Sequence, residues 1–128
     1  MAYGGGAYLA AAFDIRIGCD RSSFRFLAVK AGLVSGTWTL PMIVGFSMAK
    51  ELLFTGRVVN AEESYRIGLL NHLVPAAGVL PTSIDIAKEI AGNYQSAVRG
   101  LKDILNHNIG MGLSEMYNNE RQTVTRSV

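Results

Sequence analysis

Three consecutive glycines, Gly4-Gly5-Gly6, open the chain and lead directly into a run of small apolar residues that ends at Ala12. Glycine tolerates a positive φ angle and allows a ligand to come close to the backbone. The small residues predict a buried helix over 6–12, whose free N–H groups and positive dipole end face whatever precedes it. This geometry suits an oxygen atom that carries negative charge, at rest or during a reaction.

A dinucleotide-binding fingerprint is the other interpretation of such a glycine run. That motif requires a later glycine where this chain has Leu9, and it requires a strand–helix–strand unit that the sequence before the glycines does not supply. The dinucleotide interpretation is therefore excluded.

The composition limits the class of protein. The 128 residues are 49% hydrophobic and 17% charged, so we expect a folded chain of at most one full domain. The net charge of +2 comes without a Lys/Arg cluster, which argues against a nucleic-acid partner. Cys19 is the single cysteine, and no apolar run reaches membrane-spanning length. Glycines and Asp14 interrupt the apolar start, so a signal peptide is not expected there. A cytoplasmic, non-membrane location is expected.

The mean hydropathy of +0.23 is high for a short chain. Such a value predicts either a large core or an apolar surface that a partner covers.

Short strands alternate with helices up to about Pro81, and the chain is predicted to be helical from there on. Strands are expected at 14–19, 24–26 and 69–75, and helices at 41–45, 47–54, 61–67, 82–91, 94–106 and from 113 to the end. Ser47 is expected to cap one helix, and Asn60 with Glu63 a second one as a capping box. The change near Pro81 predicts two segments, 1–80 and 81–128.

Several segments, in this order, resemble the enoyl-CoA hydratase/isomerase (crotonase) superfamily. The glycine turn resembles the glycine triplet of that family, and residues 13–17 resemble its "CDIRIA" strand. Residues 40–57 resemble "RLPR-x-VG-x-x-x-A-x-EL-x-x-TGR", and residues 61–74 resemble "A-x-EA-x-x-x-GLVN-x-VV". The resemblance covers nearly the whole chain, and its specificity comes from order and spacing together.

This resemblance implies an α/β fold. Residues 1–80 would form the C-terminal part of the ClpP/crotonase-like spiral ββα core, and 81–128 the helical trimerisation region. We expect the N-terminal half of the core pattern to lie outside this sequence.

The resemblance also implies an oxyanion hole. In the family, two backbone N–H groups hold a thioester carbonyl and stabilise an enolate-like anion. The middle glycine that gives one of them matches Gly5, whereas the loop that gives the other has no match here. Gly4, Gly6, Gly36 and Trp38 match positions expected to contact substrate, although the default place of Trp38 in its helix is the core.

The family's two catalytic glutamates are replaced. Hydratases of the family use them for acid–base work on a water molecule, and the matching positions are Tyr8 and Ala28. Alanine cannot transfer a proton and a phenol is a poor base at neutral pH, so the two-glutamate hydration mechanism is not expected. Tyr8 is expected as a pocket wall or core aromatic whose hydroxyl is able to donate to a substrate carboxylate or a water.

The remaining polar candidates are assigned structural roles. Asp14 is expected to form hydrogen bonds at the start of a strand, His72 to belong to a strand, and His107 to sit favourably at a helix C-terminus. Cys19 is expected to be a small buried hydrophobe. No metal-ligand spacing is present, so neither a metal nor any cofactor is expected apart from a CoA thioester as substrate.

We therefore expect an acyl-CoA-binding protein of the crotonase family that stabilises a thioester enolate and assembles as a homotrimer or hexamer. Two alternatives remain open. The first is a decarboxylase or hydrolase of an acyl-CoA thioester, since such chemistry needs fewer acid–base groups. The second is a non-catalytic remnant that survives by oligomerising through its helical half.

Overall fold

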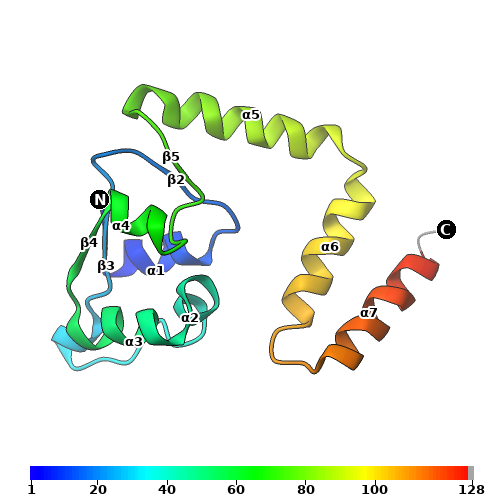
Figure 1. Ribbon diagram of the computed structural model, residues 1–128, viewed down its shortest axis with the longest axis horizontal. Coiled ribbons are helices and arrows are strands. Elements are labelled where there is room, and N and C mark those ends of the chain that lie inside the picture. The colour runs from blue at the N-terminus through cyan, green and yellow to red at the C-terminus, as the bar shows by residue number, and fades with distance from the viewer. Residues whose placement is uncertain (127–128) are drawn as a thin grey trace. The chain divides into compact units, whose positions relative to one another are not determined.

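The computed structural model describes residues 1–126, with side chains up to residue 123. The chain divides into two compact units, Met1–Ser83 and Ile84–Val128. All the strands belong to the first unit, and the second is helical, as Figure 1 shows.

Five short strands form two small sheets in the first unit. β1 (Ala2–Tyr3), β3 (Ser23–Arg25) and β4 (Val58–Asn60) form a sheet in the order β1-β3-β4, with β1 parallel and β4 antiparallel to β3. β2 (Ile17–Gly18) pairs in parallel with β5 (His72–Leu73).

The strand expected at 14–19 is shorter than predicted, since only Ile17–Gly18 are in a ladder. The N–H of Arg16 donates to Oδ1 of Asn71 at 2.8 Å, so a side chain takes the place of a strand neighbour. Arg16 is therefore not part of the strand, which begins at Ile17.

The helices of the first unit follow the predicted pattern closely. They are α1 (Gly5–Ala12), α2 (Thr39–Val44), α3 (Phe46–Thr55) and α4 (Ala61–Arg66), with two 3₁₀ turns, η1 (Ala28–Ala31) and η2 (Ala76–Gly78). The Asn60 half of the expected capping box is confirmed, because Oδ1 of Asn60 accepts the N–H of Glu63 at 2.9 Å. The Glu63 carboxylate binds Arg57.

The expected cap of α3 is wrong. Gly45, with a φ of 80°, is both the C-cap of α2 and the N-cap of α3, so α3 starts at Phe46. Ser47 therefore lies inside the first turn. Gly45, which lies in the turn between the two helices, thus occupies the N-cap position that was expected for Ser47.

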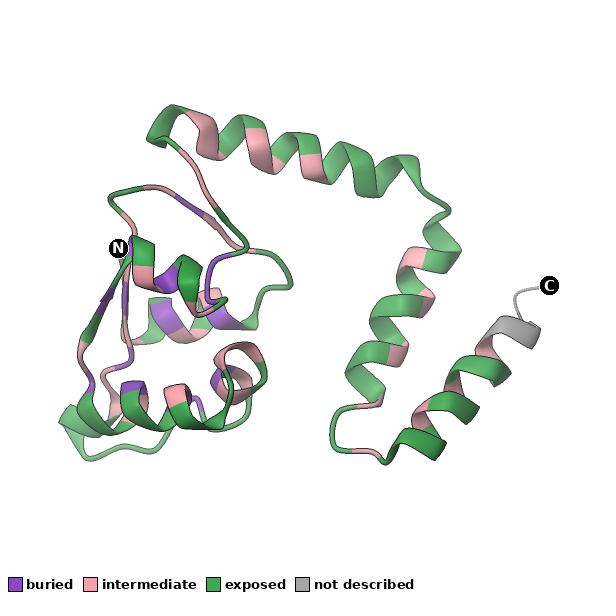
Figure 2. Cartoon of the chain, viewed as in Figure 1, coloured by how far each residue is buried: buried purple, intermediate pink, exposed green. Residues whose placement is uncertain are grey.

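The core of the first unit is a cluster of apolar side chains between α1, α2, α3 and the strands, and its members are among the buried residues shown in purple in Figure 2. Its largest fully buried apolar members are Phe26, Leu40, Leu52, Val59 and Leu69. Ala7 and Ala11 of α1 are buried as well. Their small side chains lie one helical turn apart on the same face, which lets the α1 backbone approach the core closely.

Two residues expected in the core are not buried there. Trp38 is 72% exposed, because it precedes the six-residue helix α2, whose buried contact is made by Leu40 two positions later. Two helical positions differ by about 200°, so the two side chains point in nearly opposite directions. Cys19 is only half-buried, since it lies in the turn after β2 where its N–H donates to Oγ of Ser22.

The second unit contains α6 (Gln95–His107) and α7 (Leu113–Arg126), and α5 (Val79–Gly92) runs across the boundary between the units. They correspond to the three predicted helices, although α5 begins at Val79 and not at residue 82. The last two residues of the helix predicted from 113 to the end lie outside the described residues. Nε2 of Gln95 donates to the carbonyls of Ile90 and Ala91 at 3.1 and 3.2 Å, which satisfies the C-terminal end of α5. No helix within the described part of the chain has both the length and the apolar content needed to cross a membrane.

Arg57 connects the end of α3 to the start of α4. Its guanidinium donates to both carboxylate oxygens of Glu63, at 2.8 and 2.6 Å, and to Glu51 at 2.9 Å. The hydrogen bonds from Arg57 hold the pKa of the Glu63 carboxyl below its ordinary value. A paired carboxylate whose pKa is lower in the folded state stabilises the fold above its unfolded pKa and loses that effect as the pH falls.

We predict that Arg57→Met lowers the free energy of unfolding by about 1–2 kcal/mol at pH 7, since a bidentate ion pair is lost. The difference from the wild type should shrink as the pH falls below the ordinary glutamate pKa of about 4.3 and Glu63 becomes protonated. Denaturant unfolding at a series of pH values measures both effects.

Arg66→Met is the matched control, because Arg66 also pairs with Glu63 but at 3.6 Å and with its side chain 69% exposed. Its cost should be below about 1 kcal/mol. Equal costs for the two variants, or a cost of Arg57→Met that stays constant down to about pH 3, would contradict the assignment.

Candidate functional site

The glycine turn is fixed by backbone hydrogen bonds at Gly4. Gly4 has a φ of 55°, a backbone conformation that residues with a side chain rarely adopt. Its N–H donates to the carbonyl of Arg25 in β3 at 2.9 Å, and its own carbonyl accepts the N–H groups of Ala7 and Tyr8 at 3.0 and 3.2 Å. The start of α1 is thereby tied to the sheet.

Gly5 and Gly6 are the first two residues of α1 and both are exposed. The N–H groups of these positions have no acceptor inside the helix. Neither residue has a positive φ, and a Cβ built on either would meet no atom of the described chain within 4 Å. Among the described residues, neither the backbone conformation nor packing requires glycine at these two positions.

Tyr8 lies one turn into α1 and is half-buried. Its ring packs edge-on against Phe26, with the ring centroids 5.4 Å apart. Its hydroxyl oxygen accepts the N–H of Ala28, at the start of η1, at 3.2 Å. Tyr8 and the backbone of Ala28 are therefore in direct contact through this hydrogen bond.

Gly36 is packed against the same tyrosine. A Cβ at this position would lie 2.7 Å from Cε1 of Tyr8 and 3.2 Å from Cδ2 of Leu53, and the φ of Gly36 is 77°. The structure thus brings Tyr8, Ala28 and Gly36 together. Trp38, by contrast, is exposed at the surface and is not part of the core.

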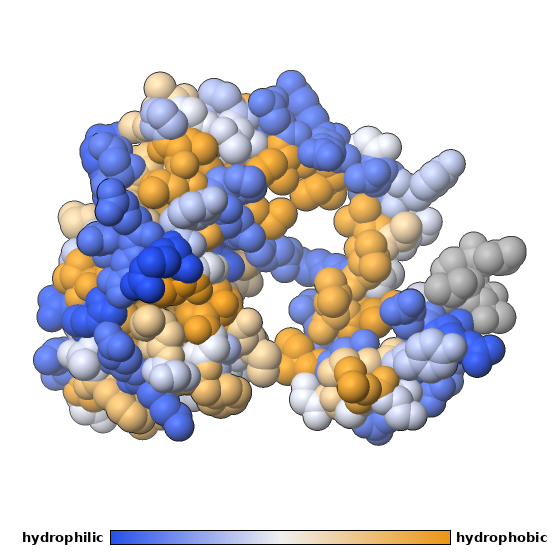
Figure 3. Space-filling model, in the orientation of Figure 1, coloured by the Kyte–Doolittle hydropathy of each residue, from blue (hydrophilic) through white to orange (hydrophobic). Residues whose placement is uncertain are grey.

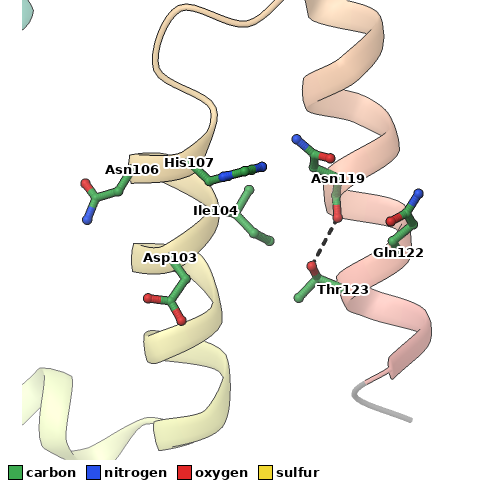
Figure 4. Close-up of a pocket in the computed structure, with 7 residues that line it drawn as sticks. All are labelled: Asp103, Ile104, Asn106, His107, Asn119, Gln122 and Thr123. Atoms are coloured by element: carbon green, nitrogen blue, oxygen red, sulfur yellow. Dashed lines mark hydrogen bonds between the residues drawn. The ribbon is translucent and has the colours of Figure 1, made fainter.

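Sequence analysis did not find the cavity of about 380 Å³ between α6 and α7 (Figure 4). Asp103, Ile104 and His107 line it from α6, and Asn119 and Thr123 from α7. Nδ2 of Asn119 donates to Asn108 at 2.9 Å and Oγ1 of Thr123 to the carbonyl of Asn119 at 3.1 Å. The bond from Asn119 links α7 to the residue that follows α6, whereas the bond from Thr123 stays within α7.

The described residues contain no group of three His, Cys, Asp or Glu side chains able to hold a metal ion. His72 is exposed in β5, next to the turn that Arg16 fastens. Nε of Arg16 donates to the carbonyl of Leu69 at 2.6 Å, and burial lowers the pKa of this guanidinium against the opposing effect of Asp14. The contacts of Arg16 are thus explained without a ligand.

Comparison with known proteins identifies the architecture that contains this glycine turn. The family model described as enoyl-CoA hydratase/isomerase matches residues 1–127. Crotonyl-CoA hydratase of Syntrophomonas wolfei is 42% identical over 102 residues, which cover 77% of this chain and 39% of that protein. Carnitinyl-CoA dehydratase of Escherichia coli K12 is 31% identical over 128 residues, 98% of this chain and 49% of the relative.

Solved structures agree. Enoyl-CoA hydratase from Bacillus anthracis superposes with a TM-score of 0.92 at 33% identity, over 97% of this chain and 49% of that one. A protein from Thermobifida fusca YX, solved in complex with acetoacetyl-CoA, superposes with a TM-score of 0.92 at 27% identity, over 98% and 51%. The chain thus spans about half the length or less of these relatives. The residues folded here form part of a crotonase-like α/β core followed by helices, and the chain belongs to the enoyl-CoA hydratase/isomerase family.

Proposed function

We propose that this chain binds the thioester group of an acyl-CoA at the start of α1. The carbonyl oxygen accepts the N–H of Gly5, which also stabilises the negative charge that develops on this oxygen when an enolate forms. In the family pattern a second N–H comes from a loop that these 128 residues do not contain. The chain therefore supplies one of the two donors.

The observation that supports this proposal is the pair of uncovered glycines at the start of α1. Gly5 and Gly6 have no positive φ and have open space beside them, so alanine would fit. Alanine is favoured over glycine within helices by about 1 kcal/mol. Access of a ligand to the backbone would explain why glycine, which favours the helix less than alanine does, occupies positions 5 and 6 although alanine would fit.

Hydration by a glutamate pair does not form part of the proposal. Tyr8 and Ala28 occupy the two matching positions, and their mutual hydrogen bond joins a phenol to a backbone N–H. Neither group is suited to activate water at neutral pH.

The chemistry that fits better is one in which enolate stabilisation is the main requirement. Loss of carbon dioxide from an acyl thioester that carries a carboxylate on its α-carbon breaks the bond between the two carbons, leaves the electron pair on the thioester enolate and needs no base. Decarboxylation, or hydrolysis of an acyl-CoA thioester, is thus the second candidate, and the contact between Tyr8 and Ala28 favours it over hydration.

We predict that the chain binds acetoacetyl-CoA more tightly than free CoA in a calorimetric titration. Gly5→Ala should weaken acetoacetyl-CoA binding by about threefold to tenfold, because a Cβ approaches the ligand and disturbs one hydrogen bond. The same substitution should leave the free energy of unfolding unchanged or raise it by up to about 1 kcal/mol.

Gly92→Ala is the matched control for this experiment. Gly92 ends α5, has no positive φ and has no atom within 4 Å of an added Cβ, as is true of Gly5. It should not change thioester affinity. Equal affinity for acetoacetyl-CoA and CoA would overturn the proposed thioester binding. Hydration of crotonyl-CoA at the rate of a family hydratase would overturn the exclusion of hydration.

We also propose that the helical unit mediates self-association, as a trimer or a hexamer. Leu101 and Leu105 lie one turn apart on α6 and are 62% and 69% exposed, and Leu113 and Tyr117 of α7 are exposed as well. Figure 3 shows hydrophobic residues in orange at the molecular surface. Exposed apolar residues that repeat at helical spacing indicate a surface that a partner covers.

We predict that the wild-type chain sediments as an oligomer at micromolar concentration and that Leu105→Glu dissociates it, because the new charge would be buried in the interface. Ser96→Glu is the control. Ser96 is exposed on the same helix, and its nine-residue offset from Leu105 places it about 180° away. A wild-type monomer, or dissociation by both variants alike, would contradict this assignment.

A further inference from the structure

We propose that Tyr8 is a specificity-determining residue whose hydroxyl donates a hydrogen bond to an oxygen atom of the bound acyl group. The site then favours short acyl thioesters with a β-oxygen over saturated chains of the same length. This inference rests on the proposed function, since it requires that a thioester binds at the start of α1.

The first step is the direction of the hydroxyl group. A phenol donates one hydrogen bond and accepts others. The N–H of Ala28 donates to the oxygen of Tyr8, so the acceptor side of this group is in use. Among the groups that the structure describes, none accepts the hydroxyl hydrogen, and the side chain is half-buried. The hydrogen therefore remains available for a ligand.

The second step is the position of this donor relative to Gly5. Tyr8 follows Gly5 by three residues in α1, so the two lie on the same face about 4.5 Å apart along the axis. Side chains on a helix lean toward its N-terminus, which directs the Tyr8 ring to the end where the Gly5 N–H is exposed.

Two backbone contacts from one short segment place the hydroxyl near the helix start. Arg25 accepts the N–H of Gly4, and Ala28, three residues later, donates to the hydroxyl of Tyr8. Three residues span at most about 10 Å. The start of α1 and the Tyr8 hydroxyl thus contact the same short segment, and we infer from this that the hydroxyl reaches the acyl chain of a thioester whose carbonyl is held at Gly5.

The third step is the rigidity of the ring. Phe26 packs on one side of it, and the backbone of Gly36 comes so close that a Cβ there would be 2.7 Å from Cε1 of Tyr8. With its oxygen also held by Ala28, the tyrosine has little freedom to turn away. A donor held in one place discriminates between ligands better than a mobile one, because less order is lost on binding.

The test compares 3-hydroxybutyryl-CoA with butyryl-CoA, which differ by one oxygen, in calorimetric titrations of the full chain. The wild type should bind the hydroxylated thioester about threefold to tenfold more tightly. In Tyr8→Phe the ratio of the two dissociation constants should fall close to one, while the affinity for butyryl-CoA changes by less than about twofold.

A second pair of variants tests whether the position of the ring matters. Gly36→Ala should displace the Tyr8 ring and reduce the preference for the hydroxylated thioester. Gly32→Ala is the matched control, because Gly32 also has a positive φ, of 69°, but has nothing within 4 Å of an added Cβ. It should keep the wild-type ratio.

The outcomes separate this inference from the proposed function. If the wild type binds both thioesters equally, or if Tyr8→Phe keeps the ratio or weakens both ligands by the same factor, Tyr8 has no selective role and thioester binding still stands. If the wild type binds neither thioester, both proposals are overturned.

Discussion

The hydrogen bond between the N–H of Gly4 and the carbonyl of Arg25 is the contact on which the site depends. It joins the turn before α1 to β3 and fixes where the helix begins. With Gly4 held at a φ of 55°, its carbonyl accepts the first two bonded N–H groups of α1, and those of Gly5 and Gly6 stay uncovered. Ala7 and Ala11, both buried, then hold the helix against the core.

Most of the helices and the order of the elements could be predicted, because the apolar period and the glycine and asparagine boundaries are local signals. The lengths of the strands could not. β2 has only two residues because the N–H of Arg16 donates to the side chain of Asn71, 55 positions later in the sequence, and not to the backbone of a neighbouring strand. The cap expected at Ser47 and the core position expected for Trp38 were wrong for a similar reason. The turn at Gly45 decides where α3 begins, and the inward direction of Leu40 leaves Trp38 facing solvent.

The site was predicted as a set of separate positions, and the structure adds how three of them depend on one another. Tyr8, Ala28 and Gly36 are remote in sequence, yet the phenol accepts the Ala28 N–H and its ring occupies the space where a Gly36 side chain would lie. A larger residue at position 36 is incompatible with this ring. Contacts between residues that are remote in sequence leave no local pattern, so the sequence indicated these residues but not that they touch one another.

Binding and catalysis differ in how much they depend on the number of hydrogen bonds to the thioester oxygen. A single neutral hydrogen bond changes affinity by about 0.5–1.5 kcal/mol, whereas one missing oxyanion donor costs about 2.7–4 kcal/mol in the transition state. In the proposed function, in which Gly5 is the one donor that these residues supply, thioester affinity is retained while turnover falls about a hundredfold or more. Differences in dissociation constant between matched variants thus report on Gly5 and Tyr8 directly, and the absence of turnover alone would say nothing against either residue.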